Sequence, residues 1–105
     1  MSWSIQYLPE AKADLQKLDP SVRLEVVKGI RKVSQKPGAD GYGKPLGHIH
    51  AGNLSGLFKI KFKRSGLRVV YALQHKDEAM CIIVIAARAD GAVYREAGKR
   101  LRKHP

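Results

Sequence analysis

Residues 57–73 alternate between apolar and basic side chains in a pattern that predicts a β-hairpin with two different faces. Successive residues of a strand point to opposite sides of a sheet. Along the first strand, three apolar residues alternate with three lysines: Phe58, Ile60 and Phe62 with Lys59, Lys61 and Lys63. Ser65 and Gly66 supply the turn. Arg68 returns to the basic face of the second strand, because the apolar face continues with Leu67, Val69, Tyr71 and Leu73.

The register of this hairpin brings like charges together. If Phe62 lies opposite Leu67, then Lys61 lies opposite Arg68. Like charges directly across a pair of strands destabilise it. Lys59, Lys61 and Arg68 share this face with no carboxylate among them in the hairpin. We therefore interpret the basic face as a surface that binds an anion.

The N-terminal third of the chain predicts one strand and two helices. Residues Trp3–Leu8 suit a first strand, and Pro9 suits the first turn of a helix. Asp19 and Pro20 end that helix and start the next, with Asp19 at the N-cap position. The second helix shows one apolar stripe at helical spacing: Val22, Val26, Ile30 and Val33. The connection is so short that we expect a helical hairpin.

The remaining segments predict a long loop, a buried strand and a final helix. Residues Pro37–Gly56 contain six glycines and two prolines and are interpreted as irregular up to a short extended piece. Residues Ala79–Ala87 are apolar throughout, which predicts a strand buried on both faces. Residues Gly91–Arg102 predict a basic helix capped by Asp90, with a narrow apolar edge formed by Val93, Ala97 and Leu101.

The order of these elements predicts the fold class. Helices that precede a run of mainly antiparallel strands indicate an α+β domain with two layers. We expect a twisted, mainly antiparallel sheet with an N-terminal helical hairpin on one face and the C-terminal helix near the other. The length of 105 residues suits a single domain over residues 1–105.

The charge of the chain indicates the chemistry of its partner. The formal net charge is +11, which favours a polyanion, either nucleic acid or an anionic membrane surface. The single cysteine, Cys81, cannot form an internal disulfide and fits a reducing compartment. No apolar run reaches the roughly 18 residues that a spanning helix needs, and no signal pattern is present. We therefore expect a cytoplasmic protein.

Several candidate residues also have ordinary structural interpretations. Lys63 and Arg64 at the turn suit a solvated surface. Arg88 could pair with Asp90, and Tyr94 could be a half-buried helix aromatic. A metal site is not expected, since His48 and His50 lack a third ligand at suitable spacing. Cys81 is not expected to be a nucleophile, because nothing nearby in the sequence would lower the pKa of its thiol.

The absence of paired carboxylates and metal ligands from the pattern restricts any catalysis to Lys, Arg and Tyr. Such residues can support cleavage of RNA without a metal. The ribose 2′-OH attacks the adjacent phosphate, and cations stabilise the charge on the phosphate oxygens. A lysine crowded by other cations can serve as a general base. An aromatic ring can stack on a base and orient the substrate.

Three segments of the chain resemble the RelE/ParE superfamily of toxins from bacterial toxin–antitoxin pairs. They are the opening IQYLPEAKADLQKLD, the hairpin FKIKFKRSGLRVVYAL and the closing ARADGAVYREAGKRL. The opening is shared by the whole superfamily, whereas the two basic segments are specific to the RelE-type mRNA endonucleases. Two features depart from the family: the Pro37–Gly56 loop is longer than in compact members, and Ala86-Ala87-Arg88 lacks a common glycine.

The resemblance implies a set of catalytic residues. Lys61 would be the general base and Arg88 the general acid for the leaving 5′ oxygen, while Lys59 and Arg68 hold the phosphate. Tyr94 would stack on the substrate and orient it. Further RNA contacts are expected from three other basic residues: Lys63, Arg64 and, in the basic tail of residues 100–104, Arg100.

The resemblance also implies partners and a biological role. We expect a type II toxin that cleaves mRNA in the ribosomal A site without a metal or organic cofactor. Its partners would be the ribosome, mRNA and a cognate antitoxin of net negative charge, with no membrane partner. One alternative is a ParE-like toxin that inhibits DNA gyrase by binding, although such members generally lack the full cationic set. A third interpretation is a plain RNA-binding domain.

Overall fold

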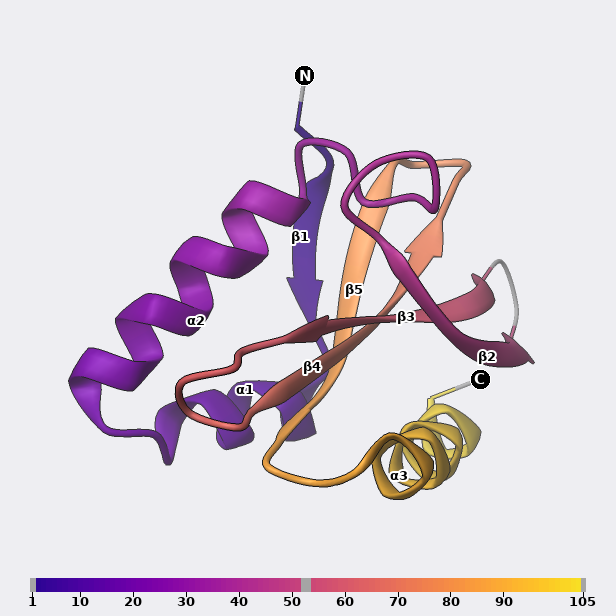
Figure 1. Ribbon diagram of the computed structural model, residues 1–105. Coiled ribbons are helices and arrows are strands. Elements are labelled where there is room, and N and C mark those ends of the chain that lie inside the picture. Colours follow the sequence, from indigo (N-terminus) through magenta and orange to yellow (C-terminus); the bar gives the residue numbers. More distant parts are fainter. Residues whose placement is uncertain (1, 52–53, 105) are drawn as a thin grey trace.

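The computed structural model describes residues 2–51 and 54–104, with the side chains of residues 47–51 and 54–55 outside the description (Figure 1). It confirms the predicted α+β class. Within these ranges no helix is both long enough and apolar enough to cross a membrane. The elements in chain order are β1 (Ser4–Tyr7), α1 (Pro9–Gln16), α2 (Pro20–Val33), β2 (Lys44–Ala51), β3 (Leu54–Lys61), β4 (Arg68–Gln74), β5 (Ala79–Ala86) and α3 (Asp90–Lys103).

The strands form one sheet in the order β1-β5-β4-β3-β2. β1 runs parallel to β5, and the other neighbours are antiparallel. The predicted hairpin register is confirmed, since Lys61 pairs with Arg68 and the Phe62 amide donates to the Leu67 carbonyl at 2.9 Å. Gly66 closes the turn with a φ of 76°, a conformation that glycine adopts without strain.

The interpretation of residues 37–56 as an irregular loop was wrong in part. β2 occupies Lys44–Ala51 and pairs with β3, so the sheet has one more strand than the sequence pattern predicted. Pro45 and Gly47 made this strand difficult to predict from the sequence, because both residues are rare inside sheets. β2 lies at the edge of the sheet, where a proline is tolerated because only one side of the strand needs partners.

Two apolar layers lie on opposite faces of the sheet, because alternate residues of β4 point in opposite directions. α1 and α2 open as a V and cover the first face (Figure 1). The buried residues of that layer include Ala11, Val26, Ile30, Val33, Phe62, Val69, Tyr71, Leu73, Met80 and Ile82. α3 covers the second face, where the buried residues are Leu57, Val70, Ala72, Ile83, Val84, Val93, Ala97 and Leu101. The predicted apolar edge of α3 and the predicted burial of β5 on both faces are thus confirmed.

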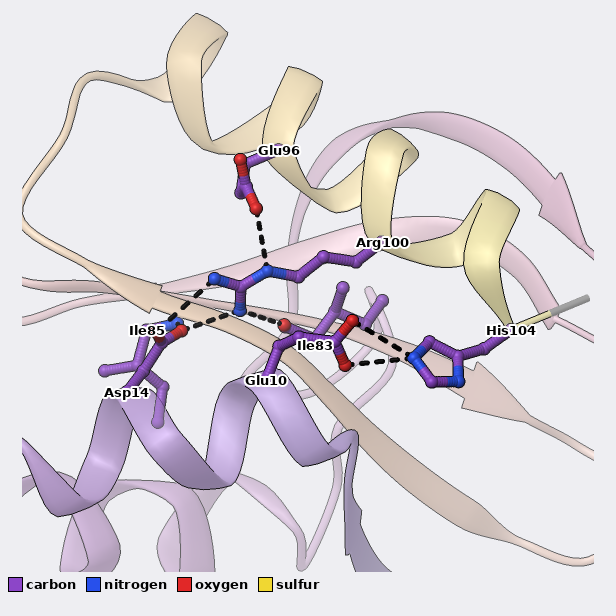
Figure 2. Close-up of polar contacts among 7 residues, drawn as sticks. All are labelled: Glu10, Asp14, Ile83, Ile85, Glu96, Arg100 and His104. Atoms are coloured by element: carbon purple, nitrogen blue, oxygen red, sulfur yellow. Dashed lines mark hydrogen bonds and ion pairs between the residues drawn. The ribbon is translucent and has the colours of Figure 1, made fainter.

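Arg100 anchors α3 to the sheet and to α1 (Figure 2). Val70 pairs with Val84 and Tyr71 with Ile82, so Ile83 is the extra residue of a β-bulge in β5. Arg100 Nη1 donates to the carbonyl of this bulge residue, Ile83, at 2.8 Å and contacts Asp14 Oδ2 at 2.7 Å.

Further contacts complete this anchor (Figure 2). Asp14 Oδ2 also accepts from the amide of Ile85 at 3.1 Å, and Glu96 accepts from Arg100 Nε at 2.9 Å. His104 Nε2 lies 2.9 Å from Glu10 Oε1. α3 is therefore held by more than its narrow apolar edge. The Arg100 side chain is only 13% exposed, so its position suits a structural role better than the predicted contact with RNA.

Tyr71 links the core to the start of the segment that precedes β2. Its side chain is buried, its ring stacks on Phe58 with centroids 5.5 Å apart, and its hydroxyl donates to the Pro37 carbonyl at 2.8 Å. Burial raises the pKa of Tyr71 well above its ordinary value.

Replacing Tyr71 with Phe should lower the free energy of unfolding by about 1–2 kcal/mol at neutral pH, because the Pro37 carbonyl loses its donor. The folded-state pKa lies above the unfolded-state value, so wild-type stability falls as the pH rises past about 10. Tyr71→Phe should lose less stability over that rise than the wild type. Urea unfolding at neutral pH and at a pH above about 10 tests this prediction. Tyr42→Phe, at an exposed tyrosine, is the control. Equal alkaline losses in all three proteins would contradict the prediction.

Candidate active site

The basic residues of the hairpin gather on the side of the sheet that α3 covers. Lys61 pairs with Arg68 across β3 and β4, and residues directly opposite each other share a face. Lys44 of β2 pairs with Lys59 and so adds a fourth cation to this face. We call these residues, Lys44, Lys59, Lys61 and Arg68, the basic surface. The sequence pattern missed Lys44 because the strand that carries it was not recognised.

A carboxylate lies within the basic surface, contrary to the sequence interpretation. Asp90 is the first residue of α3 and makes no side-chain cap, so its predicted capping role was wrong. Its Oδ2 contacts Lys59 Nζ, and its Oδ1 lies 2.7 Å from Arg68 Nε in an ion pair. The hydrogen bond from Lys59, helped by the nearby Arg68, holds the pKa of Asp90 below its ordinary value.

Arg88 lies in the exposed segment of residues 87–89 that joins β5 to α3. Arg68 Nη1 donates to the Arg88 backbone carbonyl at 2.6 Å, which ties this segment to β4. Over the part of the chain that the structure describes, the guanidinium of Arg88 has no hydrogen-bond or ion-pair partner, and the alternative of an Arg88–Asp90 pair is not observed. Lys61 is also exposed, and its side chain has no hydrogen-bond or ion-pair partner among those residues.

The predicted catalytic cations therefore fall into two groups. Lys59 and Arg68 are mostly covered and share one carboxylate, with side chains 21% and 19% exposed. Lys61 and Arg88 are open to solvent. Such an arrangement can fix a phosphate through the covered pair while the open pair reaches the atoms on either side of it.

The other predicted residues lie around this centre. Tyr94 is half-buried on α3, packs beside the apolar layer and lies four residues after Asp90, on the same side of the helix. Lys63 and Arg64 are exposed at the hairpin turn, as the sequence predicted.

His48, His50 and Cys81 are the residues that could form two other kinds of site, a metal site and a nucleophile. The side chains of His48 and His50 lie outside the described residues. The residues that are described contain no group of three or more potential metal ligands. Cys81 is half-buried in β5, and burial raises the pKa of its thiol, which disfavours the reactive thiolate.

No family model matches the sequence, but individual proteins do. The chain is 28% identical to the mRNA interferase toxin RelE of Escherichia coli K12, over 96% of this chain and 99% of that protein. A mutant of E. coli toxin RelE in the free state superposes with a TM-score of 0.73 at 24% identity, covering 95% of this chain and 98% of that one. The intact E. coli RelBE toxin–antitoxin complex contains a similar chain, with a TM-score of 0.65 at 21% identity, covering 84% and 99%. Since the sequence similarity spans nearly the whole chain and the fold is shared, these comparisons support the predicted resemblance of the chain to the RelE toxin superfamily.

Proposed function

We propose that the protein is the toxin of a toxin–antitoxin pair and acts as an endoribonuclease that cleaves mRNA in the ribosomal A site. The observation that supports this most is the grouping of Lys59, Lys61 and Arg68 on one face, next to the segment that carries Arg88. A relative that the match covers over 99% of its length is named as an mRNA interferase toxin.

The proposed reaction forms a bond between the ribose 2′ oxygen and phosphorus and breaks the bond between phosphorus and the 5′ oxygen. Lys61, in its neutral form, accepts the proton of the 2′-OH. Arg88 donates a proton to the leaving 5′ oxygen. Lys59 and Arg68 stabilise the charge on the non-bridging phosphate oxygens. The products are a 2′,3′-cyclic phosphate and a free 5′-OH.

Tyr94 and the turn residues have supporting roles in this proposal. Tyr94 stacks on a base of the substrate and aligns the 2′ oxygen with phosphorus. Lys63 and Arg64 contact the RNA backbone beside the site, where their exposure makes them available to phosphates. The ribosome would supply further polyanionic surface for a chain of net charge +11.

The proposal also includes an antitoxin partner. A solved structure similar to this chain is a toxin–antitoxin complex. The net charge of +11 suits a neutralising segment of net negative charge, because complementary charge speeds encounter and sets register. We expect that segment to cover the basic surface or to act on α3.

Cleavage of mRNA on programmed ribosomes tests the proposed reaction. The protein should produce transcripts that end within the A-site codon and carry a 5′-OH on the downstream fragment. Cleavage should persist at a chelator concentration that leaves the sedimentation of the ribosomes unchanged. Ribosomes without the protein provide the background. Intact transcripts, or cleavage that disappears in chelator, would contradict the metal-free mechanism.

Induced expression separates this function from the gyrase alternative. An mRNA endonuclease should stop translation rapidly and leave cleaved transcripts. Filamentation and a DNA-damage response with intact transcripts would instead support inhibition of gyrase. If induced expression were harmless to the cells, the result would support the interpretation of the protein as a plain RNA-binding domain.

A further inference from the structure

The two cations that the proposed mechanism assigns to the phosphate are already occupied by an anion of the protein itself. Asp90 places one oxygen on Lys59 and the other beside Arg68. The carboxylate is 43% exposed, whereas the two cations are each about one-fifth exposed. An incoming phosphate would therefore meet the carboxylate before it reached the cations.

Asp90 is poorly suited to the other roles that an aspartate could have here. It does not cap α3 with its side chain. Both of its oxygens face cations, and its pKa is lowered, so it is a weak acceptor for the proton of a 2′-OH. Its geometry is that of a carboxylate held where two cations converge, as a phosphate group would be.

We propose that Asp90 is an internal competitor for the RNA phosphate, which must displace the Asp90 carboxylate from Lys59 and Arg68 in order to bind. This inference rests on the proposed function only in assigning a phosphate to those two cations. The consequence is an affinity for RNA that is lower than the charge of the basic surface would give. Binding then favours substrates that other contacts hold in place.

The local structure allows this displacement without unfolding. Asp90 follows the exposed segment of residues 87–89 and its side chain is 43% exposed, so the carboxylate has room to turn toward solvent. The rest of α3 stays in place during such a movement, because Arg100 holds the helix to Asp14 and to the Ile83 carbonyl.

Replacement of Asp90 by Asn tests the proposal, because it removes the charge and keeps the shape of the side chain. Asp77→Asn is the matched control, since Asp77 is exposed in the β4–β5 turn and the substitution changes the net charge equally. Binding is measured by fluorescence anisotropy with a single-stranded 2′-O-methyl RNA, over a series of salt concentrations. This RNA lacks the attacking hydroxyl and cannot be cleaved.

Asp90→Asn should bind this RNA roughly tenfold more tightly than the wild type at low salt, because one further net positive charge becomes available to the phosphates. The slope of log affinity against log salt should steepen by about 0.7. Asp77→Asn should change the affinity less than about twofold. Weaker binding by Asp90→Asn would show that the carboxylate positions the cations, and would overturn the proposal. An effect equal to that of the control, or no measurable binding, would overturn it as well.

This result is independent of the cleavage experiment. Tighter binding by Asp90→Asn together with no cleavage on ribosomes would leave the competitor role intact and reject the proposed reaction. Cleavage on ribosomes together with unchanged binding by Asp90→Asn would reject the competitor role and leave the proposed reaction intact.

Discussion

Replacing Lys61 or Arg88 with alanine should lower the rate of mRNA cleavage on ribosomes by about 10²–10³-fold, the effect expected when a charged contact to the transition state is lost. The two side chains are exposed and have no partner within the described ranges, so their removal should leave the fold intact. Single-turnover cleavage with the variant in excess over programmed ribosomes measures the chemical step. Circular dichroism checks that each variant is folded.

Lys63→Ala is the matched control, because Lys63 is an exposed lysine of the same hairpin and its loss changes the net charge equally. It should reduce cleavage only slightly, and mainly at high salt. Arg68→Ala should also abolish activity, but it leaves the Asp90 carboxylate with one partner fewer and is harder to interpret. Similar losses in Lys61→Ala, Arg88→Ala and Lys63→Ala would indicate general electrostatic docking instead of a catalytic set.

Replacing Arg100 with alanine should lower the free energy of unfolding by about 3 kcal/mol, a value near the low end for breaking a buried ion pair. The substitution leaves Asp14 without its cation and the Ile83 carbonyl without a donor. The side chains of Arg100 and Asp14 are mostly buried, at 13% and 17% exposure, so solvent cannot replace these contacts easily. Equilibrium urea unfolding, monitored by the single tryptophan, Trp3, measures the loss.

Arg102→Ala is the control for this experiment, because Arg102 is an exposed arginine on the same helix and should change stability by less than about 0.5 kcal/mol. A double-mutant cycle with Asp14→Ala isolates the coupling between the two side chains. If Arg100→Ala were no more destabilising than Arg102→Ala, Arg100 would not be the anchor of α3, and its predicted role as an RNA contact would regain support.

The sequence predicted the parts of the fold that depend on local alternation. The hairpin register followed from the alternation of lysines with Phe58, Ile60 and Phe62, because a shift by one residue would expose the whole apolar face. The burial of β5 followed from an uninterrupted apolar run. The positions of Lys59, Lys61 and Arg68 on one face followed from the same period of two residues.

The contacts that the sequence could not predict join residues far apart in the chain. Lys59 and Asp90 are separated by 31 positions, and Arg100 and Asp14 by 86. Nothing in the local pattern distinguishes Asp90 from a helix cap or Arg100 from an exposed tail residue. β2 was missed for a different reason, since Pro45 and Gly47 weaken the strand pattern and the pairing with β3 compensates for them.

The parallel pairing of β1 with β5 has a consequence for the order in which the protein folds. The Ser4 amide donates to the Glu78 carbonyl at 3.0 Å, and this contact spans 74 positions. During synthesis, β1 therefore cannot pair with its partner until β5, the last strand in the chain, has been made. The loop that this contact closes is long, which slows the search for the native pairing. The Arg88 segment follows β5 and reaches Arg68 only once β5 has paired with β4, so the basic surface and this segment also come together late in synthesis.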